Sequence, residues 1–470
     1  MASYAARLRL TYPFKPPSTS IDHIVIGGGV VGLSVAAGLV NVCGKDRTTF
    51  VIERRDQLGQ ETTARNSEVI HSGIYYPEGT LKSRLCIRGR EMMYERCRKL
   101  GIDHRKTQKL LVATDSSQIS YLTKIKERMT QPSFLRSSEK THESTSVCPV
   151  QPLTGDQARE LEPDLSSQVV SALLIPETGI VDSQALVDSL AREIEEPEYL
   201  YSSNAEEIAV GVDVTGERRR REPGEGVIML GTRVIRIDKD FKEDGWIVQM
   251  ETGWEGLKDG EKGQVESVKT NVIVNAAGLG AVSLMEGLVP TEEMKEMWLV
   301  KGNYMSYKGP GVENISRLIY PCPGNSVDHL GTHLTIDLSG NIKFGPDVQP
   351  IGPNSKYQTN PDFWQSHLTP TVSAETFAKS VQSYLPNIDP SRLTPDYVGF
   401  RPNLVAPGQG FSDFHIVHSK DRKGLIELLG FNSPGLTSSL ATGEYVGEMV
   451  RREVYGLKGL DWGGLGYGWR

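Results

Sequence analysis

The sequence contains little cysteine. Its 470 residues include five, at Cys43, Cys86, Cys97, Cys148 and Cys322. The number is odd, and no two of them form a Cys-x-x-Cys pair. This pattern excludes a disulfide framework and a zinc site built from paired cysteines, and it indicates a reducing compartment and a protein without a bound metal.

Positively charged residues are outnumbered by acidic ones, since the chain has 52 Lys and Arg against 59 Asp and Glu and a net charge of −7. An acidic chain of this kind is not expected to have nucleic acid as its partner. One basic run, Arg218 to Arg221, is flanked by Glu217 and Glu222. We interpret that run as a solvated surface loop.

Long apolar runs are limited to one stretch, from Ile24 to Gly44, which carries no charged residue. A membrane-spanning helix needs about 20 mostly apolar residues, so the length suffices. Three consecutive glycines, Gly27 to Gly29, would however weaken a helix by roughly 1 kcal/mol each. The run divides more naturally into a short buried strand, a glycine turn and a helix, and we predict no transmembrane segment.

Acidic residues are absent from the first twenty positions, which carry Arg7, Arg9 and Lys15. An arginine-bearing start without acids resembles a mitochondrial transit peptide. The prolines would interrupt an amphipathic helix, and a disordered tail of a cytoplasmic protein explains the composition nearly as well. Residues 1–20 are therefore expected to be a transit segment or a tail, in a mitochondrial or a cytoplasmic protein.

The rest of the chain alternates between helical and strand patterns. Helices are predicted at 81–101 and 183–194, strands at 109–114, 226–240, 245–251 and 270–278, and exposed loops at 131–152, 195–226 and 253–267. Early alternation followed by a β-rich stretch predicts an α/β fold, in which a Rossmann-like nucleotide-binding domain is interrupted by a β-rich α+β domain.

The glycine turn has the spacing of a dinucleotide site. Gly27, Gly29 and Gly32 form G-x-G-x-x-G between a predicted strand and a helix. In such a turn the glycines permit a tight bend, close approach of a pyrophosphate and helix–strand packing, respectively. Glu53 follows 21 positions after Gly32, where an acid binds a ribose hydroxyl, so NAD or FAD is expected rather than NADP.

A later strand, "TNVIVNAAG" at 270–278, closes on the small residues Ala276, Ala277 and Gly278. This ending resembles the second dinucleotide contact of FAD-dependent oxidases and dehydrogenases. By composition alone, any buried strand running into a helix would look the same.

The segment "QETTARNSEVIHSGIYYPEGTLKSRLCIRG", residues 60–89, closely resembles the corresponding part of L-2-hydroxyglutarate dehydrogenases, in the D-amino-acid oxidase-like flavoprotein superfamily. The resemblance resumes at "TGIVDSQAL", "KGNYMSY", "IYPCPG", "LGTHLT", "GNIKFGPD", "VGFRP" and "NSPGLTSS", and it extends from Ile21 to about Arg451. Two departures are that Lys301 replaces the usual arginine and Glu68 the usual glycine.

The resemblance implies an enzyme with non-covalently bound FAD that oxidises a 2-hydroxy acid, most simply L-2-hydroxyglutarate to 2-oxoglutarate, and passes the electrons to an unidentified acceptor. An amino acid, a secondary amine or glycerol 3-phosphate remains an alternative substrate. It also implies a discontinuous FAD domain, residues 21–105, 175–290 and 395–455, with 106–174 and 291–394 forming the substrate domain.

The resemblance also assigns roles to individual residues. His71 is expected to accept the hydroxyl proton, with His333 as the second candidate. Substrate contacts are expected from Tyr75, Tyr76, Lys301, Tyr304 and Arg401. Cofactor contacts are expected from Gly27, Gly29, Val30, Val31, Gly32, Glu53, Arg54, Asn66, Ser67, Val69, Ile70, Val234, Ala276, Ala277, Gly278, Gly435, Leu436 and Thr437.

Overall fold

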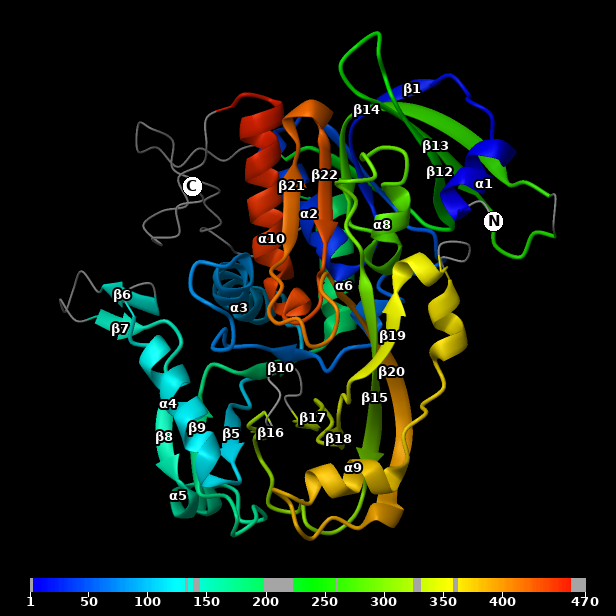
Figure 1. Ribbon diagram of the computed structural model, residues 1–470. Helices are drawn as coiled ribbons and strands as arrows, with labels where there is room; N and C mark the ends of the chain where they lie inside the picture. The colour runs from blue at the N-terminus through cyan, green and yellow to red at the C-terminus, as the bar shows by residue number, and fades with distance from the viewer. Residues whose placement is uncertain are drawn as a thin grey trace.

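The computed structural model describes residues 3–131, 134–137, 144–197, 223–258, 261–323, 331–357 and 362–457. The arginine run at 218–221, and most of the loop predicted at 195–226, lie outside these residues. The described chain is built on two large sheets, which occupy the upper and lower halves of Figure 1.

The first sheet has eight strands. Six of them lie in the order β11 (Glu225–Met229), β2 (Thr48–Ile52), β1 (Thr19–Ile26), β14 (Gln264–Asn275), β13 (Trp246–Thr252) and β12 (Thr232–Lys239). Strand β22 (Leu425–Leu429) also pairs with β14, and β21 (His415–His418) pairs with β22. Because β1 runs parallel to both β2 and β14, it forms the buried centre of the sheet.

Helices α2 (Val30–Cys43) and α6 (Ser183–Glu195) pack on one face of this sheet, α10 (Gly435–Met449) packs against α2, and α3 (Leu81–Leu100) packs against α10. Helices α2 and α10 cross with their backbones in contact, because a Cβ on Gly38 would lie 2.4 Å from the Gly443 carbonyl oxygen. The apolar run is thus divided between β1 and the 14-residue α2. Within the described ranges, every helix is too short or too polar to cross a membrane.

The second sheet has nine strands. Eight follow the order β19 (Gln349–Pro353), β15 (Trp298–Tyr307), β18 (Ile342–Phe344), β17 (Leu334–Ile336), β16 (Leu318–Pro321), β5 (Lys109–Ala113), β9 (Ser171–Ile175) and β8 (Gln151–Thr154), and β20 (Leu393–Asn403) pairs with β15. Helices α4 (Ile119–Arg128), α5 (Gly155–Leu161) and α9 (Ala374–Val381) pack against this sheet in one apolar core.

Two small sheets complete the architecture. Strand β10 (Gly179–Val181) pairs with β3 (Val69–Ile70) and β4 (His104–Arg105), and β6 (Leu135–Ser137) pairs with β7 (Ser144–Ser146). The eight-stranded sheet draws its strands from 19–52, 225–275 and 415–429. The boundary expected at 395 falls inside β20, whose residues pair with β15 in the other sheet.

Three local predictions were wrong. The segment expected to be an exposed loop at 131–152 contains β6, β7 and the start of β8, and its Phe134 and Cys148 side chains are buried. The strand expected at 226–240 is two strands, because the chain turns at Gly231, where φ is +57°, and β11 and β12 then pair with different partners. The loop expected at 253–267 ends early, since β14 begins at Gln264 to pair with β13. Strand β11 pairs with β2, which is remote in sequence, whereas β14 pairs with the preceding strand β13.

The N-terminal segment is part of the fold rather than a disordered tail. Helix α1 (Tyr4–Thr11) is capped by the Ser3 side chain and lies beside β12 (Figure 1). The Tyr12 hydroxyl donates to the fully buried Glu251 carboxylate at 2.8 Å, and Gln249 accepts a hydrogen bond from the Lys15 backbone N–H at 2.8 Å. Of the two alternatives expected for residues 1–20, the disordered tail does not agree with these contacts, because its polar groups have buried partners on β13.

Candidate active site

A cavity of about 560 Å³ runs between the two sheets. It is lined by 21 of the 25 residues that the sequence singled out: Gly27, Gly29, Val30, Val31, Glu53, Arg54, Asn66, Ser67, Val69, His71, Tyr75, Tyr76, Val234, Ala276, Ala277, Gly278, Tyr304, His333, Arg401, Gly435 and Leu436. The four that do not line it are Gly32, Ile70, Lys301 and Thr437.

At one end, the glycine turn forms a cradle that a side chain would fill. Gly27 has φ +114°, and a Cβ there would lie 2.5 Å from the Ala276 carbonyl oxygen. A Cβ on Gly32 would lie 2.0 Å from the Gly27 oxygen, so Gly32 packs helix against strand and does not face the cavity. The N-terminus of α2 opens toward the cavity from Gly29, which suits a pyrophosphate.

Glu53 follows the last residue of β2. Its carboxylate accepts hydrogen bonds from the backbone N–H groups of Gly28 at 2.6 Å and Arg55 at 2.8 Å. Burial raises the pKa of this carboxyl, and the two backbone donors oppose that rise. The side chain is thus fixed beside the glycine turn, where a ribose hydroxyl would meet it.

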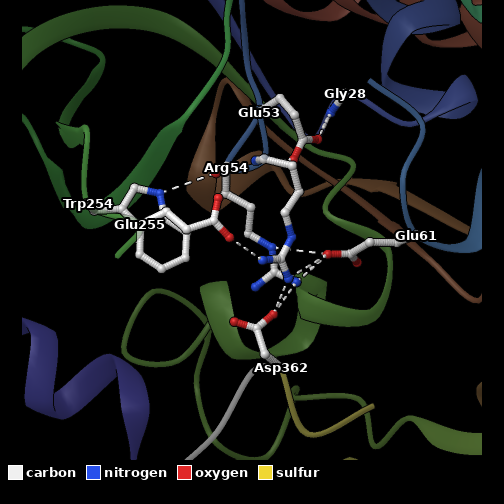
Figure 2. A network of polar contacts seen from close by, with 8 residues as sticks. Gly28, Glu53, Arg54, Glu61, Trp254, Glu255 and Asp362 are labelled. Carbon is white, nitrogen blue, oxygen red and sulfur yellow. Dashed lines mark hydrogen bonds and ion pairs between the residues drawn. The ribbon is translucent and has the colours of Figure 1, made fainter. Parts of the chain in front are cut away.

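The two arginines after Glu53 form an ion-pair network, shown in Figure 2. Arg54 pairs with Glu61 and, at 3.0 Å, with Asp362, while its carbonyl accepts from the Trp254 indole N–H at 3.2 Å. Arg55 pairs with Asp362 and with Glu255 at 3.1 Å. The network ties the end of β2 to two distant segments of the chain along the wall of the cavity.

The turn at residues 275–278, which the sequence predicts as a second dinucleotide contact, is held by the Asn275 side chain. The Asn275 side chain donates to the Ala281 carbonyl at 2.8 Å and accepts from the Ala277 N–H at 3.3 Å, while Gly278 has φ +52°. Ala276 and Ala277 leave open space on the cavity side because they carry small side chains. The strand ending is thus part of the cavity wall and not an ordinary strand-to-helix turn.

The opposite end of the cavity is built by the segment after Asn66 and by the start of α10. No side chain caps the N-terminus of α10, where Gly435 and Leu436 line the cavity. The Thr437 hydroxyl accepts from the His71 N–H at 3.0 Å and donates to the Val69 carbonyl at 3.2 Å. Thr437 therefore holds the His71 segment in place instead of facing the cavity.

His71 presents a neutral imidazole. Its Nε2 lies 3.3 Å from the Ser433 hydroxyl, and its Nδ1 is buried without a hydrogen-bond partner among the described residues. Burial, followed by the positive charge of Lys109, lowers the pKa of His71 to about 3. A ring that is unprotonated at neutral pH can accept a proton.

Aromatic rings and one guanidinium complete this end. The His333 ring stacks on Tyr320 with centroids 3.6 Å apart, and Tyr304 stacks on Tyr397 at 4.3 Å. Arg401 donates to the Asp347 carbonyl at 3.4 Å and lines the cavity. Tyr320 was not assigned a role from the sequence, although it lies in the quoted segment "IYPCPG". Its pairing with His333 depends on how β16 and β17 lie in the sheet.

Lys301 differs from the expectation. Its amine donates to the Thr369 carbonyl at 2.7 Å and to the Thr371 hydroxyl at 3.2 Å, away from the cavity. The side chain points there because β15 presents alternate residues to opposite faces of the sheet. Glu68, at the usual glycine position, adopts φ +55°, and its carboxylate accepts from Ser183 at the start of α6.

Residues outside the predicted set also line the cavity, including Tyr4, Leu8 and Arg9 of α1. No sequence signal placed α1 there, because its contacts are with residues more than 200 positions away. The glycine cradle, the acid at the end of β2 and the two helix N-termini suit a dinucleotide, and the volume is typical of a ligand site.

Comparison with known proteins agrees with this geometry. The family described as FAD dependent oxidoreductase matches residues 22–449. The chain is 32% identical over 436 residues to the mitochondrial L-2-hydroxyglutarate dehydrogenase of Arabidopsis thaliana, covering 92% of this chain and 84% of that one. It is 23% identical to L-2-hydroxyglutarate dehydrogenase of Escherichia coli strain K12, covering 92% of this chain and 93% of that one.

Solved structures share the fold at lower identity. The L-alpha-glycerophosphate oxidase of Mycoplasma pneumoniae, with FAD bound, superposes with a TM-score of 0.68 at 20% identity, covering 95% of this chain and 98% of that one. Glycine oxidase from Geobacillus kaustophilus superposes with a TM-score of 0.63 at 17% identity, covering 94% of this chain and 97% of that one. The chain belongs to the FAD-dependent oxidoreductases, with FAD as its cofactor.

Proposed function

We propose that the protein oxidises L-2-hydroxyglutarate to 2-oxoglutarate. The observation that carries this proposal is the pairing, in one cavity, of a neutral histidine with an arginine and several tyrosines. The names of the plant and bacterial relatives support the same substrate. FAD supplies the hydride acceptor for such a reaction.

His71 is the proposed base. As the hydride leaves C2 of the substrate, the hydroxyl must lose its proton, and an unprotonated imidazole within hydrogen-bond reach accepts it. The Ser433 hydroxyl and the Thr437 contact to the His71 backbone fix the ring. His333, stacked on Tyr320, is proposed to orient the substrate hydroxyl.

Arg401 is the proposed carboxylate ligand, because a guanidinium matches the two oxygens of a carboxylate. The hydroxyls of Tyr75, Tyr76 and Tyr304 are proposed to donate to the substrate. Burial raises the pKa of each of these tyrosines, so they remain protonated donors at neutral pH. Lys301 has no part in this scheme, since its amine is bonded elsewhere.

Anaerobic bleaching of the bound flavin tests the substrate. The protein is mixed without oxygen with L-2-hydroxyglutarate, its D isomer, glycerol 3-phosphate and glycine, and the flavin absorbance is recorded. We expect bleaching by L-2-hydroxyglutarate at least tenfold faster than by the others. Faster bleaching by glycine or glycerol 3-phosphate would contradict the proposal and identify one of the alternative substrates.

We also propose a mitochondrial location. The acid-free N-terminal segment and the names of the plant and animal relatives support it. Residues 1–30 fused to a fluorescent reporter should direct it to mitochondria. A diffuse cytoplasmic signal would favour the alternative, a protein that remains in the cytoplasm.

A further inference from the structure

Lys109 is a buried amine that the proposed reaction does not use. It is the first residue of β5, between β16 and β9 in the nine-stranded sheet, and its side chain is 0% exposed. Its Nζ has no hydrogen-bond partner among the residues that the structure describes. Burial of an unpaired amine costs free energy, so such a residue calls for an explanation.

The amine lies between two aromatic rings of the cavity wall. Its Nζ is 4.5 Å from the ring centroid of Tyr75 and 4.6 Å from that of Tyr320, which are cation–π distances. His333 stacks on Tyr320 with an interplanar angle of 9°, so the amine takes the other face of that ring. Both tyrosines line the cavity and Lys109 does not, so the charge of Lys109 lies directly behind the cavity wall.

The groups around the amine titrate far from neutrality. Tyr75, Tyr320, His71 and the Cys86 thiol surround it, and none of these described neighbours is a carboxylate. Burial raises the pKa values of the tyrosines and of Cys86, and it lowers that of His71 to about 3. Burial lowers the pKa of Lys109 to about 7, against an opposing effect of Cys86.

We propose that Lys109 is a positioning residue of the active site, whose buried charge, held against the Tyr75 and Tyr320 rings, attracts an anionic substrate. The proposal rests on the proposed function, in which the substrate is a dicarboxylate. A unit charge roughly 10 Å from a carboxylate, at an effective dielectric constant near 20, changes binding by roughly tenfold.

Binding of glutarate, a dicarboxylate without a hydroxyl to oxidise, tests this assignment. Its dissociation constant is measured at pH 6 and pH 8.5 from the perturbed flavin absorbance of the holoenzyme. We expect wild-type affinity to fall by roughly tenfold between the two pH values as Lys109 loses its charge. Lys109→Met should bind weakly at both, while the uncharged glutaramide should bind wild type and variant alike.

Two matched variants separate this effect from general charge loss. Lys106→Met removes an equal charge three residues away, from an exposed amine paired with Glu177 at 2.8 Å. Lys82→Met removes an amine that faces Asp413 and donates to Asn432. Burial lowers the pKa of this amine to about 8. Both should keep the wild-type pH dependence, and loss of that dependence in Lys82→Met would overturn the proposal.

The outcomes distinguish this inference from the proposed function. Failure of wild-type protein to bind glutarate at any pH would overturn both. If Lys109→Met binds glutarate as tightly as wild type does, the role of Lys109 alone is overturned. The same holds if Lys109→Met is less stable to heat but its glutarate affinity keeps the wild-type pH dependence. Should Lys109→Met not fold, a flat pH profile in the wild type overturns the proposal by itself.

Discussion

Replacement of His71 by alanine is the sharpest test of the proposed chemistry. With a pKa of about 3, only about one imidazole in 10⁴ is protonated at pH 7, so the ring is free to accept a proton, as a weaker base than a histidine whose pKa lies near the operating pH. Loss of a positioned base costs about 10² to 10⁴ in rate. His71→Ala should slow flavin reduction by that factor. The FAD should stay bound, because Thr437 holds the segment through the His71 backbone N–H.

The pH dependence follows from the same pKa. An ordinary histidine would make the rate rise through about pH 6.5, and the sequence alone predicts that behaviour. The pKa of His71 is lowered instead, so its ring is already neutral above about pH 4. The rate of flavin reduction at saturating substrate should therefore be flat from pH 5.5 to 8.5.

Rapid anaerobic mixing measures both effects. His333→Ala is run in parallel, and His104→Ala serves as the control, since His104 contacts the Ile102 carbonyl away from the cavity. Flavin reduction by His71→Ala within threefold of wild type, together with an inactive His333→Ala, would assign the proton transfer to His333.

Three further perturbations have expected outcomes. Glu53→Ala should raise the FAD dissociation constant about tenfold, measured by flavin fluorescence, since a hydrogen bond to a charged acceptor contributes about 1.5 kcal/mol; unchanged affinity would contradict a ribose contact. Tyr12→Phe should lower the free energy of unfolding in urea by about 1.5 kcal/mol, because it removes one of three donors to the buried Glu251 carboxylate, which keeps those from Arg233 and Gly263. Tyr4→Phe, whose hydroxyl is partly exposed, should lower it less. His23 is fully buried, and burial lowers its pKa to about 4, so its folded-state pKa lies below the unfolded value near 6.5. The neutral His23 ring therefore contributes fully to the free energy of unfolding above pH 6.5, and this contribution is lost as pH falls toward 4. The loss reaches about 2 kcal/mol by pH 5. In urea titrations, His23→Gln should weaken this pH dependence of the free energy of unfolding.

Much of the cofactor end could be predicted from the sequence because its determinants are local. The G-x-G-x-x-G turn and Glu53 lie within 27 consecutive residues, and strand and helix periodicity around them is strong. The Ala276–Gly278 turn was ambiguous by composition, and its close approach to Gly27 could not be predicted from the sequence.

The substrate-binding end of the cavity was less predictable from the sequence, because the direction in which a side chain points matters there as much as its residue type. Lys301 lies in a matching segment, yet its amine bonds to Thr369 on the other side of β15. Tyr320 and Lys109 have no local signal, since they meet only when β16 pairs with β5. Sequence reasoning identified most residues of the cavity but not the amine behind its wall.

The contacts of the N-terminal segment have a consequence for the order of folding during synthesis. The partners of Tyr4, Arg9, Tyr12 and Lys15 all lie between residues 233 and 265, and β1 needs β14 on one side. A ribosome adds about 5–20 residues per second, so these partners emerge roughly 10–50 s after the segment itself. The N-terminal segment therefore reaches its final place only after residues 233–265 have emerged, and it stays accessible to cellular factors throughout that interval.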